Sequence, residues 1–157
     1  MAVRRAMIDD VCEIVDLGAV MHSESVFNVF EFDRDHLLNY TAWAVGREKE
    51  FGVFVSEADA GINGVIAGFV SSHYFCPDHK IVCDFLTYVH PEARGGMAAV
   101  RLVKAYEQWA KSIGVQEISF GVSAGISDEL AGRFYRGLGY KKGSVTFRKL
   151  LSDANNS

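Results

Sequence analysis

The sequence predicts an α/β fold of the α+β type, in which a mixed sheet carries helices on its faces and the elements follow the order βααβββαβαβ. Three observations predict it. Apolar residues recur at helical spacing from about Met97 to Ile113, whereas apolar and polar residues alternate from Val115 to Val122. A glycine-rich connection over residues 59–64 joins two further strand patterns. Strand and helix patterns therefore follow one another along a single chain.

The first half of the chain is expected to supply a strand, two helices and three strands. Ala2 to Ala6 has a strand pattern, and a helix is expected to begin at Asp9. Asp33 has the residue type and position to cap the second helix. The three strands that follow are expected at Phe51 to Glu57, Val65 to His73 and Ile81 to Val89.

Length and composition predict one compact domain over residues 1–151, because 157 residues with 49% hydrophobic content can bury a core. The polar residues 152–157 are expected to form a flexible tail. No secretory signal or membrane span is recognisable, so a cytoplasmic location without membrane contact is expected. The net charge of -4 and the lack of clustered basic residues argue against nucleic-acid binding.

Three cysteines, Cys12, Cys76 and Cys83, stand in apolar contexts, and their odd number favours reduced, buried thiols over disulfides. A metal site could be imagined from Cys76 and Cys83 with His79 and Asp84. Because the paired Cys-x-x-Cys spacing of zinc sites is missing, no metal is expected.

A turn after the strand that ends at Val89 is suited to an anion. Pro91 interrupts the strand, Arg94, Gly95 and Gly96 form a turn, and the long amphipathic helix follows. The first amides of a helix lack internal partners and lie at the positive end of its dipole, so a pyrophosphate is favoured there. The glycine spacing is neither that of a P-loop nor that of a dinucleotide-binding fingerprint. A turn that only reverses the chain is the alternative.

A second helix is expected to begin near Ser127, which would act as its cap, with acidic residues in its first turn and glycines at its end. A final strand is expected after it. The two helices and their preceding strands span about a third of the chain.

These two segments resemble the GCN5-related N-acetyltransferase (GNAT) family. The family pattern Gln/Arg-x-x-Gly-x-Gly/Ala aligns with Arg94 to Ala99, where Met97 replaces the first glycine of the pattern. The pattern Asn-x-x-Ala-x-x-x-Tyr-x-x-x-Gly-Phe/Tyr aligns with the second helix, where Asp128 replaces the Asn. The positions that match in that helix are Ala131, Tyr135, Gly139 and Tyr140.

The resemblance implies an acetyl-CoA-dependent N-acetyltransferase, in which a primary amine of a small molecule or protein attacks the thioester directly. It implies that the acetyl and pantetheine groups lie along the strand ending at Val89 and that the pyrophosphate lies on the amides of the glycine turn. The residues it assigns to acetyl-CoA are Thr87, Tyr88, Val89, Arg94, Gly95, Gly96, Met97, Ala98, Ala99, Val100, Asp128 and Tyr135.

Acetyl transfer needs a neutral amine and a proton for the departing thiolate. By resemblance, Tyr135 is the general acid, although it could instead pack over the cofactor without donating a proton. The glutamate base of some relatives is missing, since Gly121 and Val122 stand at its strand. Asp84 could act as the base through a water chain, or it could simply face solvent.

The residues expected to contact the amine lie mainly in Val20 to Phe32, which is interpreted as a loop between the first two helices. They are His22, Glu24 and Phe27, together with Tyr88. Carboxylates there would suit a cationic amine, whereas the phenylalanines could equally cover the sheet. A homodimer is possible, because dimers are common in the family.

A second hypothesis from another class is a catalytically silent CoA-binding module that regulates or binds a partner. Met97, Asp128 and the missing strand base support it. Transfer of an acyl chain longer than acetyl is a third reading.

Overall fold

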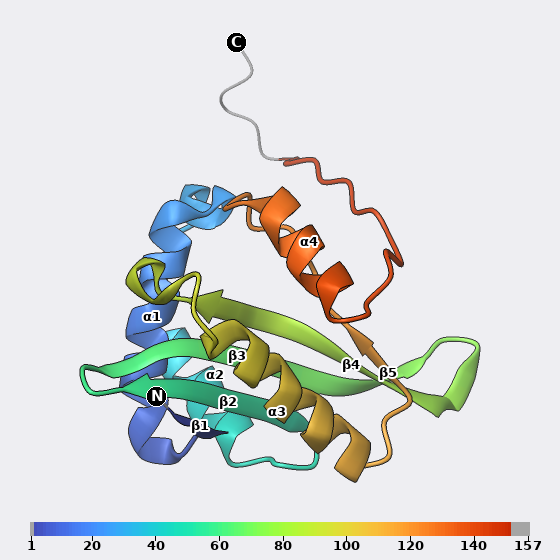
Figure 1. Ribbon diagram of the computed structural model, residues 1–157. Coiled ribbons are helices and arrows are strands. Elements are labelled where there is room, and N and C mark those ends of the chain that lie inside the picture. Colours follow the sequence, from blue (N-terminus) through green and yellow to red (C-terminus); the bar gives the residue numbers. More distant parts are fainter. Residues whose placement is uncertain (1, 152–157) are drawn as a thin grey trace. The chain divides into compact units, whose positions relative to one another are not determined.

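The computed structural model describes residues 2–151, so the tail predicted at residues 152–157 lies outside the described residues (Figure 1). The chain divides into two compact units, one that ends at Gly121 and one that begins at Val122. Each unit has its own local structure, and the candidate site residues are distributed over both.

The first unit holds the sheet and most of the helices. Its strands and α-helices are β1 (Ala2–Arg5), α1 (Val11–Glu24), α2 (Arg34–Val45), β2 (Phe51–Ala58), β3 (Gly61–His73), β4 (Cys76–Val89), α3 (Ala98–Ser112) and β5 (Glu117–Ser119). Short 3₁₀ helices lie at Ile8–Asp10, Val26–Val29 and Pro91–Ala93. Within residues 2–151, no helix is both long and apolar enough to cross a membrane.

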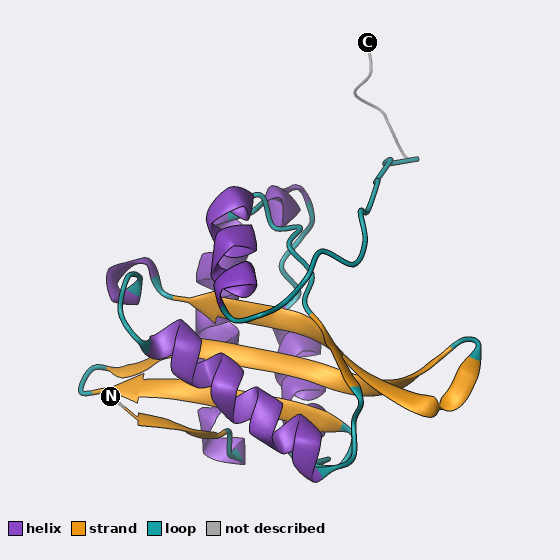
Figure 2. Ribbon diagram, turned by 45° about the vertical axis from the view of Figure 1, so that its right-hand side comes forward, coloured by secondary structure: helices purple, strands orange, loops and turns teal. Residues whose placement is uncertain are grey.

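The five strands form one mixed sheet in the order β1-β2-β3-β4-β5, which confirms the predicted fold class. The pairs from β1 to β4 are antiparallel, and β5 joins β4 in parallel. A parallel neighbour requires a crossover connection, and α3 provides it. In Figure 2, α3 covers one face of the sheet, and α1 and α2 lie on the opposite face.

The α3 face confirms the amphipathic helix predicted there. Leu102, Val103, Tyr106 and Ala110 are all buried, and Trp109 is nearly so. Two strand glycines make room for the aromatic rings: a Cβ on Gly52 would lie 2.3 Å from the Trp109 ring, and one on Gly68 would lie 1.9 Å from the Tyr106 hydroxyl. Close approach of α3 to the sheet therefore depends on these glycines.

An acidic residue precedes α2 and a glycine follows α3. Asp33 accepts a hydrogen bond from the His36 amide at 2.9 Å, which confirms the predicted cap of α2. Gly114 follows α3 with φ of 76°, the left-handed conformation that commonly ends a helix.

The β3–β4 hairpin is longer than the sequence pattern suggested. β4 begins at Cys76 rather than Ile81, although Pro77 has no amide hydrogen to give to a strand pair. The register accommodates this, because pairing shifts between Ser72↔Lys80 and His73↔Cys76. The tip residues Tyr74 and Phe75 are almost fully exposed.

β5 is shorter than the predicted strand over Val115 to Val122. Its pairing with β4 ends at Cys83↔Ser119. Beyond that point the amide of Gly121 donates to the side chain of Asp84 instead of to a strand backbone, at 2.8 Å. The side chain of Asp84 therefore accepts a hydrogen bond from the backbone beyond the last paired residues of β4 and β5.

In the second unit, α4 spans Asp128–Gly137. Ser127 lies at the N-cap position, as predicted, but it has φ of 113° and its side chain makes no capping bond. The Asp128 carboxylate instead accepts from the Gly125 amide at 3.1 Å.

The strand expected after α4 is not present in the described part of the chain. Residues 141–150 carry no strand, and the apolar side chains of Val145 and Phe147 are exposed. A strand needs a neighbour to pair with, and within residues 122–151 the second unit offers only α4 as regular structure.

The prediction of buried thiols is also wrong for two of the three cysteines. Cys12 and Cys76 are exposed and Cys83 is half-buried, and all three are free. Burial raises the pKa of the Cys83 thiol, so this group is held in its protonated form.

Candidate active site

The carboxyl end of β4 leads into a turn whose backbone is open. The amide of His90 donates to Asn63 O at 2.8 Å, which anchors the end of the strand to β3. Pro91 starts the short helix Pro91–Ala93, and Gly95 then adopts φ of 82°, a conformation that glycine permits without strain. A Cβ on Gly95 would meet nothing within 4 Å. The turn is therefore exposed on the side of Gly95.

The amides of Gly95 through Val100 have no hydrogen-bond acceptor among the described residues. Arg101 is the first residue of this run whose amide is bonded, to Met97 O at 3.0 Å. Unsatisfied donors at the positive end of a 15-residue helix favour a negatively charged group. The backbone at this turn thus offers a row of donors to a negatively charged group.

One extra residue in β4 brings Asp84 and Thr87 together. The register passes from Ala67↔Leu86 to Gly68↔Asp84, so Phe85 is bulged. In a regular strand, residues three apart point to opposite faces, but a bulge restores them to one face. The Thr87 hydroxyl accordingly donates to Asp84 Oδ2 at 2.8 Å. Both are candidate site residues from the sequence, but the contact between them was not predicted.

Asp84 lies where β4 and β5 separate. Its Oδ1 accepts from the Gly121 amide and its Oδ2 from the Thr87 hydroxyl. Burial raises the pKa of this carboxyl, and the two hydrogen bonds oppose that rise. The structure thus holds at the strand separation a carboxylate that takes up a proton more readily than an exposed one.

Glu24 makes contacts that were not predicted from the sequence. Its Oε1 accepts hydrogen bonds from the Tyr88 hydroxyl and from Arg94 Nη2. Arg94 Nε also donates to Val89 O at 3.0 Å, and its guanidinium lies 5.2 Å from the centre of the Tyr88 ring. The end of α1, the end of β4 and the glycine turn are joined here by side chains.

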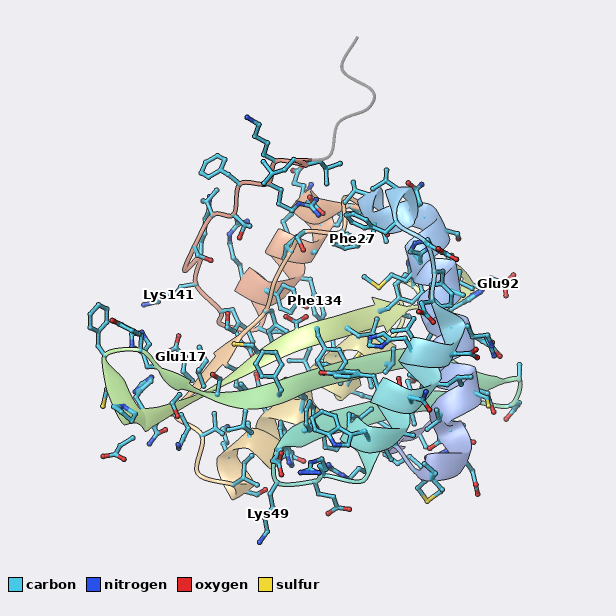
Figure 3. All side chains as sticks on the ribbon, turned by 180° about the vertical axis from the view of Figure 1, so that it is seen from behind. Phe27, Lys49, Glu92, Glu117, Phe134 and Lys141 are labelled. Carbon is cyan, nitrogen blue, oxygen red and sulfur yellow. The ribbon has the colours of Figure 1, made fainter. Side chains whose placement is uncertain are left out.

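The segment predicted as an acceptor loop is largely helical. α1 continues to Glu24, and a 3₁₀ helix at Val26–Val29 follows, which carries Phe27 (Figure 3). His22 therefore lies on the last turn of α1, where its Nε2 is 2.8 Å from Phe30 O. Ser25 is buried and accepts from the Phe27 amide at 3.2 Å. This segment is more ordered than a loop prediction implies.

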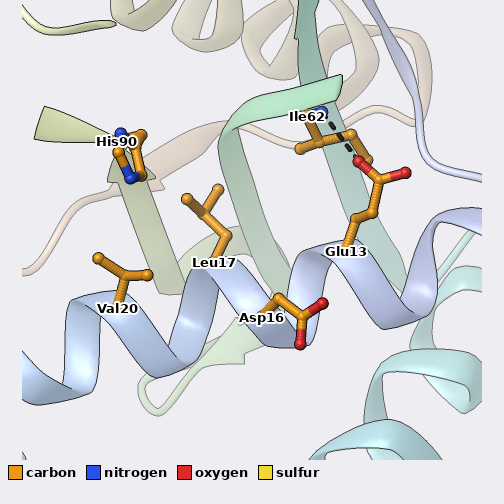
Figure 4. Close-up of a pocket in the computed structure, with 6 residues that line it drawn as sticks. All are labelled: Glu13, Asp16, Leu17, Val20, Ile62 and His90. Atoms are coloured by element: carbon orange, nitrogen blue, oxygen red, sulfur yellow. Dashed lines mark hydrogen bonds between the residues drawn. The ribbon is translucent and has the colours of Figure 1, made fainter. Parts of the chain in front are cut away.

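A shallow cleft of about 200 Å³ runs along α1 and was not expected (Figure 4). It is lined by Glu13, Asp16, Leu17, Val20, Ile62 and His90. Glu13 accepts from the Ile62 amide at 3.0 Å, and Asp16 pairs with Arg34 at 2.7 Å. Both carboxylates of the cleft are therefore already engaged.

Tyr135 and Asp128, the two site residues predicted on the second helix, belong to the second unit. Tyr135 lies on α4 with its ring 5.3 Å from that of Phe134 and 5.9 Å from that of Tyr140. Asp128 opens α4 and accepts from Gly125. Their local positions agree with the predicted helix.

The mixed sheet, the open turn after β4 and the crossover helix α3 agree with the fold that the GNAT resemblance implies. The model of the acetyltransferase (GNAT) family matches residues 17–140, which is more than half of the chain. The chain belongs to this family and is an N-acetyltransferase. Among curated protein sequences none matches significantly.

Solved structures share the fold along nearly the whole chain. The tetramutant of the BH1408 protein from Bacillus halodurans has a TM-score of 0.78 at 23% identity, covering 96% of this chain and 100% of that chain. AAC(6')-Iy, solved with the bisubstrate analogue CoA-S-monomethyl-acetylneamine, has a TM-score of 0.76 at 16% identity, with 95% and 97% covered. Glucosamine-6-phosphate N-acetyltransferase from Arabidopsis thaliana has a TM-score of 0.72 at 15% identity, with 96% and 98% covered.

Proposed function

We propose that this protein transfers the acetyl group of acetyl-CoA to a primary amine, with direct attack of the amine on the thioester. The observation that carries the proposal is the row of unbonded amides from Gly95 through Val100. Members of the GNAT family use acetyl-CoA, and these amides offer its pyrophosphate a set of donors that does not depend on side chains. Met97 and Asp128 change side chains in the family patterns, but the backbone donors at the turn are retained.

When bound, acetyl-CoA supplies the activated acetyl group. The backbone of Thr87, Tyr88 and Val89 would hold the pantetheine arm, since β4 has no partner strand beyond Cys83 on the β5 side of the described sheet. Arg94 stands directly before the pyrophosphate turn, and Asp128 is the polar residue of α4 proposed for the cofactor. No metal is required for this chemistry.

Two side chains of the protein are proposed to move protons. Asp84 is the general base, because a half-buried carboxylate with a raised pKa is suited to accept a proton from an ammonium or a water. The Thr87 hydroxyl, bonded to the same carboxylate, holds Asp84 in place. Tyr135 is the general acid, by its place in the family pattern.

We propose a small-molecule amine as the acceptor. The sugar-amine name of the Arabidopsis thaliana enzyme and the neamine analogue bound to AAC(6')-Iy support this class over a protein lysine. His22, Phe27 and Tyr88 are the side chains proposed to contact it. The carboxylate of Glu24 is already bonded to two donors, so it is less suited to bind the amine.

A panel of amines tests the proposal by the thiol that acetyl transfer releases. Aminosugars, polyamines and a lysine peptide are each mixed with acetyl-CoA, and free CoA is followed with a thiol reagent. We expect release with at least one small amine and a mass increase of one acetyl group in that amine. A silent CoA-binding module would be indicated if acetyl-CoA raised the melting temperature while no amine caused release above hydrolysis.

A further inference from the structure

We propose that Glu24 is a positioning residue for the cofactor: it holds Arg94 and thereby fixes the turn that binds the pyrophosphate of CoA. This inference rests on the proposed function, because it assigns a role to a residue beside the same turn. It replaces the expectation that Glu24 binds the acceptor amine.

Glu24 is the last residue of α1. Although it lies 70 positions before Arg94 in the sequence, the two side chains are in contact. A single carboxylate oxygen, Oε1, accepts from both Arg94 Nη2 and the Tyr88 hydroxyl. Tyr88 is 5% exposed, so the carboxylate is tied to a side chain that cannot move freely. One end of this link is therefore a buried side chain of β4.

The other end of the link is the entry to the turn. Arg94 directly precedes Gly95, and its guanidinium is held at three points: by Glu24, by Val89 O at 3.0 Å through Nε, and over the Tyr88 ring at 5.2 Å. Glycines at positions 95 and 96 leave the backbone that follows with many accessible conformations. Fixing Arg94 reduces the conformations that the turn must lose when it binds an anion.

The charges agree with this arrangement. The hydrogen bond from Tyr88, followed by that from Arg94, lowers the pKa of the Glu24 carboxyl, so the carboxylate is ionised at neutral pH. Burial, together with the bond to Glu24, raises the pKa of Tyr88, so its hydroxyl stays a donor. An incoming ammonium would have to compete with Arg94 for an oxygen that is already shared. Glu24 is therefore better suited to hold the arginine than to bind the amine.

The test compares two acetyl donors that differ in the pyrophosphate. S-acetylpantetheine has the thioester and the pantetheine arm but lacks the pyrophosphate and the nucleoside. We expect Glu24→Gln to lower kcat/KM for acetyl-CoA about tenfold, in line with the loss of a charge-assisted hydrogen bond, and to change kcat/KM for S-acetylpantetheine less than about twofold. Glu92→Gln, which alters an exposed carboxylate in the neighbouring short helix, should leave both values unchanged.

Different outcomes separate the possible failures. Equal losses with both donors would overturn the positioning role, because amine binding or general misfolding affects both reactions alike. An unchanged Glu24→Gln enzyme would overturn it as well. If the wild-type protein itself shows no preference for acetyl-CoA over S-acetylpantetheine, the pyrophosphate site of the proposed function fails instead.

A double-mutant cycle with Arg94 gives an independent check. If Glu24 acts through Arg94, Glu24→Gln in an Arg94→Met background should have little further effect on kcat/KM for acetyl-CoA. Additive losses would contradict the link. Melting temperatures of all four proteins establish that each is folded, and the conservative Glu24→Gln change keeps an acceptor for Tyr88.

Discussion

The carboxylate of Asp84 accepts two hydrogen bonds, from a backbone amide and from a hydroxyl, in a place where burial disfavours its charge. The pKa of Asp84 is raised above the ordinary value of 3.8, so this carboxyl loses its proton at a higher pH than an exposed one. A base at this position therefore becomes active only at that higher pH. If Asp84 is the general base, as proposed, the acid limb of the pH–rate profile should follow the protonation of this one residue.

Asp84→Asn is expected to lower kcat/KM by about 100-fold and to remove that acid limb. Thr87→Val is the companion variant: its hydroxyl lowers the pKa of Asp84, so losing it should move the limb to higher pH while the carboxylate remains. Rate profiles between pH 5 and 9 measure both effects. An Asp84→Asn enzyme with the wild-type profile would show that Asp84 only joins the strands.

Tyr135→Phe is expected to lower kcat by about 100-fold with a small change in the KM for acetyl-CoA, because the ring is kept and only the proton donor is lost. Tyr74→Phe removes a hydroxyl from the exposed tip of the β3–β4 hairpin and should leave kcat unchanged. If kcat of Tyr135→Phe matches that of the wild type, Tyr135 packs in the site without donating a proton.

Asp10 is a buried carboxylate with a structural role. It accepts from both terminal nitrogens of Arg4, at 2.7 and 2.9 Å, and from the Met7 amide at 2.7 Å. The hydrogen bonds from Arg4 lower the pKa of Asp10 in the folded state. Its contribution to stability is therefore full above the ordinary value of 3.8 and is lost as the pH falls through the lower folded value.

Asp10→Asn should consequently lower the free energy of unfolding at pH 7 by about 1.5–3 kcal/mol, the range for hydrogen bonds to charged groups. Urea titrations at pH 7 and at low pH measure it. The difference in the free energy of unfolding between variant and wild type should become smaller in acid. If that difference stays constant down to pH 2, the stabilisation by Asp10 does not come from its ion pair with Arg4.

At the level of helices and strands, the contact between α3 and the sheet depends on missing side chains. A Cβ on Gly68 would lie 1.9 Å from the Tyr106 hydroxyl and 2.4 Å from Cys83 O, and the backbone atom cannot move aside easily. Gly18, within α1, is the opposite case, since a Cβ there would meet nothing within 4 Å. The same substitution to alanine is therefore expected to change the stability in opposite directions at the two positions.

Gly68→Ala should destabilise the protein by about 3 kcal/mol through overpacking. Gly18→Ala should stabilise it by about 0.5–1 kcal/mol, because alanine is the better helix former and nothing obstructs it. Chemical denaturation of the two variants beside the wild type provides the comparison. A Gly68→Ala protein as stable as the wild type would mean that α3 can shift away from the sheet at little cost.

Local patterns were sufficient to predict elements whose signals lie within a few residues. The apolar stripe of α3, with Leu102 and Tyr106, and the Asp33 cap of α2 follow from spacing and residue type, and both are confirmed. The open amides at Gly95 through Val100 are likewise a consequence of where a helix begins. These features need no information on distant parts of the chain.

Features that depend on pairing between distant parts of the chain could not be predicted from local patterns. The bulge at Phe85 arises from the register between β3 and β4, and it alone brings Thr87 to Asp84. The contact of Glu24 with Tyr88 and Arg94 joins residues 64 and 70 positions apart. The strand expected after α4 is absent from residues 141–150 for a related reason, because a strand needs a partner strand and local sequence does not supply one.

For the molecule as a whole, the fold class and the family are confirmed, whereas the single domain over residues 1–151 and the homodimer stay predictions. The two residues proposed to move protons belong to different units, Asp84 to the first and Tyr135 to the second. The proposed function therefore assigns a role to each unit, and in it cofactor binding depends on the glycine turn of the first unit.

The most direct test of that dependence is a titration of ¹⁵N-labelled protein followed by amide NMR spectra, with CoA and with pantetheine. If the free amides bind the pyrophosphate, CoA should shift the signals of Gly95 through Val100 strongly, in the direction of stronger hydrogen bonding, and pantetheine should leave most of them in place. Saturable binding of CoA that leaves these six amide signals unmoved would contradict the account.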